Sequence, residues 1–211
     1  EKPSVGRELA RVLGCTRGNR GFIEGDRYVV TWAMGHLVEL ADPADYDERW
    51  KTWSLDTLPM LPERMKHRVI RQVSGQFRTV KSLFGRKDVG ALVIATDAGR
   101  EGELVARWTM LMGGWKGPVQ RLWISSQTDA AIAAGFAALA PGADYENLFH
   151  AAECRSEADW LVGLNVSRAL SCRHDARRPG QLFGRRQEGR AYRRHLARMD
   201  AQLAAEAEAP C

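Results

Sequence analysis

The sequence predicts an α/β fold, with a parallel sheet flanked by helices, followed by the beginning of a mostly helical domain. Three observations predict it. Short apolar runs alternate with segments of helical periodicity along the first 140 or so residues. The run at residues 91–96 is continuously apolar, as expected for a parallel strand that is buried on both faces. From residue 144 to about residue 170 the chain reads as helical without further strand signals.

The expected elements follow in chain order. Ser4 is a favourable N-cap residue and Gly14 a favourable terminator, so a helix is expected at residues 5–13. Apolar and β-branched runs predict strands at residues 28–33, 65–73, 91–96 and 119–124. Helical periodicity predicts helices at residues 77–84, 101–112 and 129–139. Residues 42–62, rich in Pro, Asp and Trp, are expected to form an ordered loop, and residues 140–142 a linker.

These elements divide the chain into three expected parts. Residues 1–142 form the α/β domain, and residues 143–175 begin the helical domain. Residues 176–211 are an arginine- and alanine-rich tail without any β-branched residue, which is poorly suited to a core. We expect the tail to lie outside the fold and to add only non-specific DNA affinity. Its composition is what a GC-rich gene yields when it is read out of frame.

Bulk composition narrows the functional classes. The net charge of +5 permits a polyanionic partner without requiring one. No run approaches the roughly 18 apolar residues of a membrane span, and residues 1–4 do not begin a signal peptide. The four cysteines form no C-x-x-C pair, which disfavours a zinc site or a disulfide framework and fits the cytoplasm.

The segment ATDAGREGE, residues 95–103, carries the most chemistry. It lies where an apolar strand ends and a helix begins, the edge at which open α/β sheets bind ligands. Asp97 and Glu101 are four residues apart and can face one crevice, and carboxylate oxygens are preferred ligands of Mg²⁺. The competing interpretation is that both acids only complement the dipole of the helix.

The segment EKPS, residues 1–4, is a second candidate. The Glu1 carboxylate and the Lys2 ammonium could bind a metal ion and a phosphodiester together. From spacing alone, a frayed and exposed terminus explains these two residues better.

Together these segments resemble a known family. EKPS (1–4), VTWAMGHL (30–37), ATDAGREGELVARW (95–108), RLWISS (121–126) and ADWLVGLNVSR (158–168) stand in the order found in type IA DNA topoisomerases of the bacterial topoisomerase III kind. The resemblance covers about residues 1–175 and implies a Rossmann-like Toprim domain at residues 1–142. The family's acidic D-x-D-x-E cluster falls on Asp97, Gly99 and Glu101, so glycine replaces the middle acid.

The resemblance implies a mechanism and its residues. In the family, a tyrosine attacks one phosphodiester of single-stranded DNA and forms a 5′-phosphotyrosine, so no ATP is needed. Glu1 and Lys2 would be the catalytic pair, with Lys2 offsetting charge on the phosphate. Glu1, Asp97 and Glu101 would form the Mg²⁺ site, with Glu1 and Asp97 as the main contacts. DNA would be the partner, through single-stranded segments; a helicase partner is not readable from the sequence.

Three further residues are candidate DNA contacts. Trp53 matches a family position near DNA and could stack on an unpaired base, or it could pack the long loop. Arg155 and Arg168 flank the ADW motif and could pair with phosphates, although Arg155 could instead pair with Asp159. His36, in the Gly-His-Leu turn, reads more readily as structural.

The sequence also departs from the family. The family's first strand precedes EKPS and is not part of this sequence, and a conserved family segment expected near residue 178 is replaced by the tail. The tyrosine domain does not appear either. Tyr28, Tyr46 and Tyr145 lie in the wrong motifs, and Tyr192 lies in the tail. We therefore expect a truncated topoisomerase that is inactive alone.

Two other functions are compatible with parts of the sequence. One is a non-catalytic Toprim module for DNA binding or interaction. The downstream nucleotide sequence would distinguish this module from a truncated topoisomerase, because only the latter would continue, in a second frame, into the missing family segment and a tyrosine domain. The other is a Toprim primase or nuclease, which the ADWLVGLNVSR motif disfavours.

Overall fold

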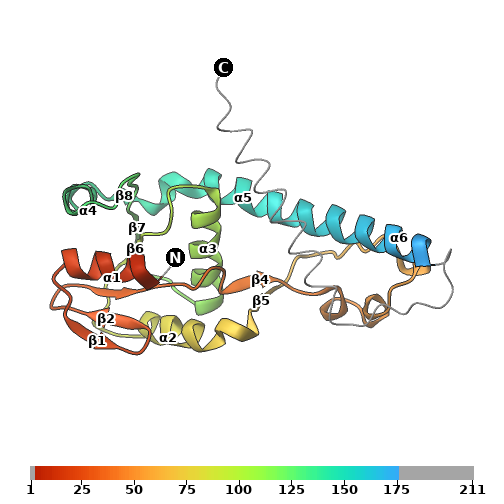
Figure 1. Ribbon diagram of the computed structural model, residues 1–211, viewed down its shortest axis with the longest axis horizontal. Coiled ribbons are helices and arrows are strands. Elements are labelled where there is room, and N and C mark those ends of the chain that lie inside the picture. The colour runs from red at the N-terminus through yellow and green to blue at the C-terminus, as the bar shows by residue number, and fades with distance from the viewer. Residues whose placement is uncertain (1–2, 176–211) are drawn as a thin grey trace, which may run out of the picture. The chain divides into compact units, whose positions relative to one another are not determined.

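The computed structural model describes residues 3–175 (Figure 1). The expected tail, residues 176–211, lies outside the described residues, as do Glu1 and Lys2. The chain divides after Arg168 into two compact units, and of the second the structure describes only the stretch from Ala169 to Asp175.

The described residues form six α-helices and eight short strands. The helices are α1 (Pro3–Val12), α2 (Ser74–Phe84), α3 (Arg100–Gly113), α4 (Asp129–Ala137), α5 (Glu146–Ala158) and α6 (Leu164–Asp175). The strands are β1 (Arg17–Asn19), β2 (Phe22–Glu24), β3 (Val29–Thr31), β4 (Val38–Leu40), β5 (His67–Val69), β6 (Leu92–Ile94), β7 (Val119–Arg121) and β8 (Ala140–Pro141). This mixture of helices and sheets, with a helical segment last, confirms the predicted fold class.

Local sequence explains where the helices begin and end. Thr128 caps α4 through its side-chain oxygen, which accepts a hydrogen bond from the Ala131 N–H at 3.3 Å. Gly114 ends α3 at φ +80°, a left-handed conformation that favours glycine, and its N–H donates to the Met110 carbonyl.

The described strands form three sheets, with less parallel pairing than the sequence predicts. The orders are β1-β2-β3, β4-β5 and β6-β7-β8, and among these strands only β6 and β7 pair in parallel. The hairpin β1–β2 was not predicted, nor was β4. The expected linker at residues 140–142 instead supplies β8, which runs antiparallel to β7.

Two further segments differ from expectation. The strand expected at residues 65–73 is shorter, since β5 is followed by a 3-10 turn, Arg71–Val73. The long loop contains three 3-10 turns: Pro43–Asp45, Glu48–Lys51 and Leu55–Thr57. In the C-terminal helical stretch, a π-helical turn (Asp159–Gly163) separates α5 from α6.

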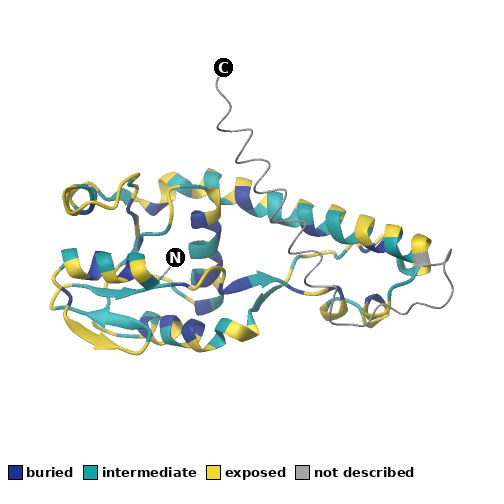
Figure 2. Cartoon of the chain, in the orientation of Figure 1, coloured by how far each residue is buried: buried dark blue, intermediate teal, exposed yellow. Residues whose placement is uncertain are grey.

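The core consists of two clusters of buried side chains. One joins α2, α3, β4 and α5, with Phe77, Leu104, Trp108 and Ala152 among its members; Figure 2 shows the buried residues of α2 and α3 in dark blue. The other joins α1, α4 and the segment after β7 through Leu9, Ile132 and Leu122. Because α5 contributes to the first cluster, residues 146–158 pack with the α/β part of the chain; the domain boundary at residue 142 stays a prediction.

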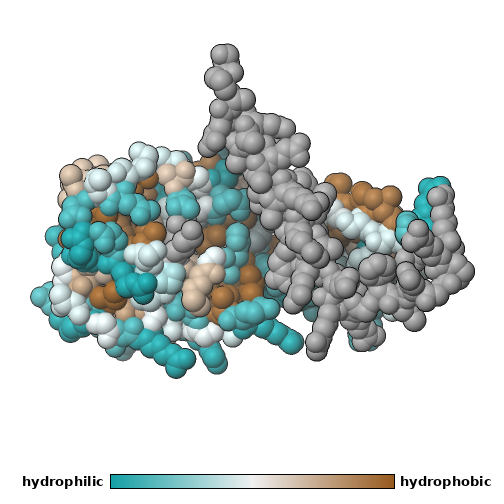
Figure 3. Space-filling view, viewed as in Figure 1, coloured by the Kyte–Doolittle hydropathy of each residue, from teal (hydrophilic) through white to brown (hydrophobic). Residues whose placement is uncertain are grey.

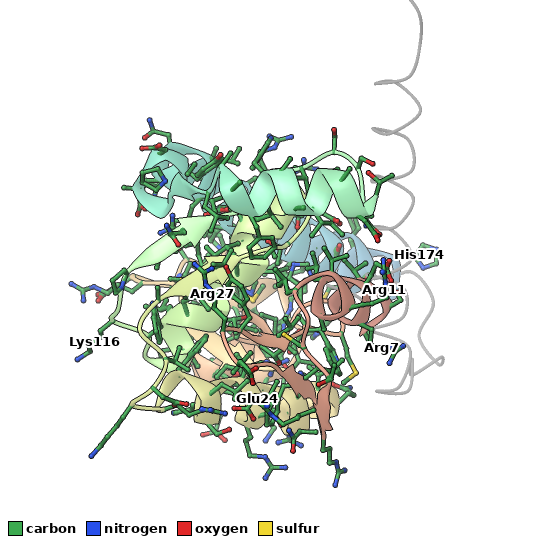
Figure 4. All side chains as sticks on the ribbon, turned by 90° about the vertical axis from the view of Figure 1, so that its left-hand side faces the viewer. Arg7, Arg11, Glu24, Arg27, Lys116 and His174 are labelled. Carbon is green, nitrogen blue, oxygen red and sulfur yellow. The ribbon has the colours of Figure 1, made fainter. Side chains whose placement is uncertain are left out.

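A cavity of about 720 Å³ lies between these clusters. Residues of β3 line one side and residues of β6 another, while α1, α2 and α3 supply further apolar walls. Strand β3 pairs only with β2, and β6 pairs only with β7, among the described strands. Glu24 and Arg27, labelled in Figure 4, also line this cavity. On the face drawn in Figure 3, apolar side chains (brown) remain visible between hydrophilic ones on this part of the molecule.

Candidate functional site

The acidic loop, residues 95–103, joins β6 to the first turn of α3. Its backbone is folded tightly, since the Gly99 N–H donates to the Asp97 carbonyl at 2.9 Å. The Thr96 hydroxyl donates to the Gly102 carbonyl at 2.8 Å. A Cβ built on Gly102 would lie only 2.1 Å from the Asp97 carbonyl oxygen, so this position needs glycine for a close approach. The loop therefore holds Asp97 at the carboxyl end of β6, as the sequence predicts.

Glu101 is exposed on the first turn of α3 and is kept anionic by basic neighbours. Its Oε2 lies 3.6 Å from Nε2 of His36. This contact, with the positive charges of Arg155 and Arg100, outweighs partial burial and lowers the pKa of Glu101 below its ordinary value. Glu101 is therefore available as an anionic ligand at neutral pH.

His36 joins this site, which the sequence alone did not favour. It follows Gly35, whose φ of +79° is left-handed and suits glycine, and this turn leads out of β3. Arg155, a predicted DNA contact on α5, acts on the same carboxylate through its charge. Its contact with Asp159 is long, at 3.8 Å, so the competing ion pair is weak.

A small pocket of about 290 Å³ borders the acidic loop. It is lined by Thr96, Asp97 and Ala98, by residues 125–127 after β7, and by Val5, Glu8 and Leu9 of α1. The first turn of α1 follows directly on Glu1 and Lys2 in the sequence. The geometry of Glu1 and Lys2 themselves lies outside the described residues.

The described acids do not form a complete metal site. Within residues 3–175, no three His, Cys, Asp or Glu side chains come together in a way that could hold a metal ion. Asp97 and Glu101 still provide hard carboxylate donors of the type that Mg²⁺ prefers, and Mg²⁺ is commonly held by only one or two carboxylates with water. The residues present fit Mg²⁺ if one further acid is supplied by the undescribed N-terminus.

Trp53 and Arg168 are two predicted DNA contacts that lie together: Trp53 stands in the long loop, residues 41–66, and Arg168 on α6. The Arg168 guanidinium lies 5.2 Å from the centre of the Trp53 ring, and its Nη1 donates to the Trp50 carbonyl at 2.6 Å. Arg168 is only 5% exposed. These contacts give Arg168 a role in holding the loop and give no support to a direct phosphate contact.

The rest of the ADWLVGLNVSR motif also holds the long loop. The Trp160 indole N–H donates to the Ala41 carbonyl at 2.9 Å. The Asn165 amide accepts from the Met60 N–H at 2.7 Å and donates to the Met60 carbonyl at 3.1 Å. Three residues of this motif, Trp160, Asn165 and Arg168, therefore hold the long loop.

Sequence reasoning did not select Arg121 and Glu103, which are buried beside the acidic loop. Both are 0% exposed and lie 3.0 Å apart, between Nε of the arginine and Oε2 of the glutamate. Arg121 opens the RLWISS segment and Glu103 closes the acidic segment, so both stood in quoted motifs without a role. The sequence signal by which they could have been identified is a charged residue next to a buried apolar strand.

Comparison with known proteins gives consistent matches. Residues 1–126 match the Toprim domain family. The chain is similar to proteins named DNA topoisomerase 3 from Bacillus cereus, with 57% identity, and from Bacillus subtilis and Shouchella clausii, each with 56% identity. Each match covers 176 residues, which is 83% of this chain and 24% of the relative. The chain thus spans about a quarter of the length of these relatives.

Proposed function

The chain belongs to the Toprim domain family, and we propose that it supplies the Mg²⁺- and DNA-binding part of a type IA topoisomerase of the topoisomerase III kind. The observation that carries the proposal is the tightly folded acidic loop, in which Asp97 follows a parallel strand and Glu101 opens the next helix. The similarity to proteins named DNA topoisomerase 3 supports the DNA substrate. The proposed reaction is breakage and rejoining of single-stranded DNA without ATP.

Each proposed residue has a distinct task. Asp97 and Glu1 would hold Mg²⁺, with Glu101 as a further anionic group. When bound, the ion would supply positive charge beside a phosphodiester. Lys2 would add a second positive charge where negative charge develops on the phosphate. His36 and, more weakly, Arg155 would favour the ionised form of the Glu101 carboxylate, since both lower its pKa.

Trp53 and Arg155 are the proposed DNA contacts. Trp53 is half-buried, with Arg168 against its ring, so an unpaired base would stack only on the part that remains accessible. Arg155 is half-buried on α5 and close enough to Glu101 to influence it, which would place a phosphate contact beside the acidic site. Arg168 is proposed to act through Trp53 rather than by touching DNA.

We further propose that an extended apolar segment preceding residue 1 fills the 720 Å³ cavity. The cavity is lined by residues of β3 and β6, each of which has one edge that pairs with no other strand within residues 3–175, and by apolar residues of α1, α2 and α3, which is the environment of a buried strand. Such a strand would run into α1 and hold Glu1 at the level of Asp97. Adding about six β-branched residues before Glu1 is expected to raise the melting temperature. An extension of the same length with a central proline should leave the melting temperature unchanged. If both extensions raise the melting temperature equally, the proposal is wrong.

Magnesium binding tests the metal assignment. Titration of the chain with MgCl₂, followed by amide NMR shifts of residues 95–103, is expected to show weak binding, because a site with few carboxylates keeps several waters. Asp97→Ala should abolish the shifts. Asp26→Ala, which removes an acid whose side chain is 97% exposed in another part of the chain, should leave them unchanged. If the Asp97 variant binds as well as the parent, the site is misassigned.

The chain alone is not expected to relax negatively supercoiled DNA, because none of the three tyrosines that the structure describes is placed as a nucleophile. Tyr28 packs edge-on against Phe136, Tyr46 packs against Trp160, and Tyr145 stacks on Trp123. Burial raises the pKa of Tyr46, which makes it a poorer nucleophile. Tyr192 lies outside the described residues. Plasmid relaxation that is lost in Tyr192→Phe would contradict this expectation, and DNA binding that ignores both Mg²⁺ and Asp97 would favour a non-catalytic module.

A further inference from the structure

Arg121, the last residue of β7, is fully buried, and such a position needs a physical explanation. A buried guanidinium loses its hydration, which is costly unless its donors find partners. Its Nη1 donates to the carbonyls of Thr96 and Leu122, both at 2.8 Å, and to that of Ile94 at 3.2 Å. Its Nη2 donates to the Asp97 carbonyl at 2.6 Å. Three of these four acceptors belong to the end of β6 and the start of the acidic loop.

The charge of Arg121 is balanced by a buried network. Glu103 lies 3.0 Å from Arg121 and 2.8 Å from Arg107, and its own side chain is 0% exposed. Arg107 also forms an ion pair with Glu146 at 3.0 Å and donates a hydrogen bond to the Gly142 carbonyl at 2.6 Å. Two arginines alternate with two glutamates, so the set carries no net charge. It ties β7 and α3 to the start of α5.

We propose that Arg121 is a positioning residue: it fixes the peptide group that carries Asp97, so that the Asp97 carboxylate is held ready for a divalent cation. The proposal rests on the metal site proposed above. Beyond Ile94 the chain leaves the ladder between β6 and β7, and the carbonyls of Thr96 and Asp97 turn to the guanidinium. The Asp97 carbonyl thereby accepts hydrogen bonds from Arg121 and from the Gly99 N–H, and it lies so close to Gly102 that a side chain there would clash with it.

Lysine cannot replace this function. An arginine offers five N–H donors in a planar fork, whereas a lysine ammonium is a compact charge with three donors at one point. Arg121→Lys therefore keeps the charge that Glu103 requires and loses the donors that reach Asp97. The substitution separates positioning from charge balance.

The test compares Arg121→Lys with Arg86→Lys. Arg86 also pairs with two carboxylates, those of Glu24 and Asp88, but it lies just after α2, and both of these partners lie outside the acidic loop. In metal-free protein, Arg121→Lys is expected to speed hydrogen exchange at the Gly99 amide, whose acceptor is the Asp97 carbonyl. On titration with MgCl₂, its affinity is expected to fall by about tenfold or more, as when outer-shell partners of a metal ligand are removed. Arg86→Lys should match the parent in both measurements.

The outcomes separate this proposal from the proposed function. A folded Arg121→Lys protein with parental exchange at Gly99 overturns the positioning role. If the parent itself does not bind Mg²⁺, the metal site fails, and Gly99 exchange still decides whether Arg121 fixes the loop. If Arg121→Lys does not fold, guanidinium NMR of the parent decides. The proposal is supported if the Arg121 guanidinium rotates slowly and its NMR signal shifts together with that of the Asp97 amide during Mg²⁺ titration. A guanidinium that rotates freely and whose signal does not change overturns it.

Discussion

The acidic loop and the long loop are both irregular, yet they are held by partners at very different distances along the sequence. Arg121 holds the carbonyl of Asp97 across 24 residues, and the Gly99 and Gly102 contacts are closer still. The long loop is held by Asn165, Trp160 and Arg168 across 105, 119 and 118 residues, respectively. The first loop is fixed by its own strand-loop-helix unit and the next strand. The second acquires its shape only when the C-terminal helices pack.

The strength of the holding interactions also differs. The acidic loop is held by a pair of fully buried charges, Arg121 and Glu103, whereas the long loop is held by neutral amide and indole hydrogen bonds, by the buried Arg168 and by partly exposed ion pairs of Arg68 with Asp42 and Asp45. Removing one member of a buried ion pair leaves a charge without a partner, while removing a neutral hydrogen bond leaves a dipole unsatisfied. Substitutions at the two loops should therefore differ in how far they lower the free energy of unfolding and in which residues they affect.

The largest effect is expected for Glu103→Ala. It leaves Arg121 and Arg107 without their shared carboxylate, and loss of one partner of a buried pair costs about 3–5 kcal/mol. Urea denaturation measures the loss in the free energy of unfolding. Asp26→Ala removes an exposed partner of Arg17 and should leave stability unchanged. If both variants behave alike, the network does not hold the acidic loop.

A smaller loss is expected for Gly102→Ala. The new methyl group would meet the Asp97 carbonyl at 2.1 Å, and relieving such a clash costs about 1–3 kcal/mol. Gly99→Ala is the matched control, since a Cβ there has nothing within 4 Å and the backbone is extended. Thermal unfolding should separate the two variants clearly. Equal melting temperatures would show that the backbone at residue 102 does not limit the loop.

Asn165→Ala should loosen the long loop and spare the acidic one. The substitution leaves the backbone N–H and carbonyl of Met60 without their partner, a cost of about 1–3 kcal/mol. Hydrogen exchange should rise in residues 42–62 while the Gly99 amide keeps its protection. Asn147→Ala, at an exposed position on α5, provides the control. Faster exchange in both loops would mean that they form one cooperative unit.

The smallest effect concerns pH at the end of the long loop. Burial lowers the pKa of His67, with the Glu153 charge opposing it, and the ring packs edge-on against Trp108 at 4.7 Å. The pKa of His67 in the folded protein lies below its unfolded value of about 6.5. Neutral His67 therefore contributes its full share to the free energy of unfolding above that pH, and this contribution is lost as the pH falls. Stability should therefore decline from pH 7.5 to 5.5, and His67→Gln should reduce this decline. His150→Gln, at an exposed histidine, should not.

Local sequence was enough for several elements and failed for others. The apolar run of β6 and the helical periodicity of α3 were predicted, because burial of each is encoded in consecutive residues. The hairpin β1–β2 was missed because Arg17–Asn19 is exposed along its whole length and shows no alternation. Strand β8 was missed because its two residues pair only through a distant partner, β7.

By itself, the sequence determined the α/β fold class, the strand-to-helix junction from β6 to α3 with Asp97 and Glu101, and the Toprim family. Only the tertiary structure decided that His36 adjoins Glu101, that Arg168 is buried against the long loop, and that Arg121 holds the peptide of Asp97. The physical reason is the separation along the chain over which each kind of interaction acts. Periodicity and capping act between neighbours in the chain, whereas a buried charge is specified by partners from separate elements, which meet only when those elements pack together.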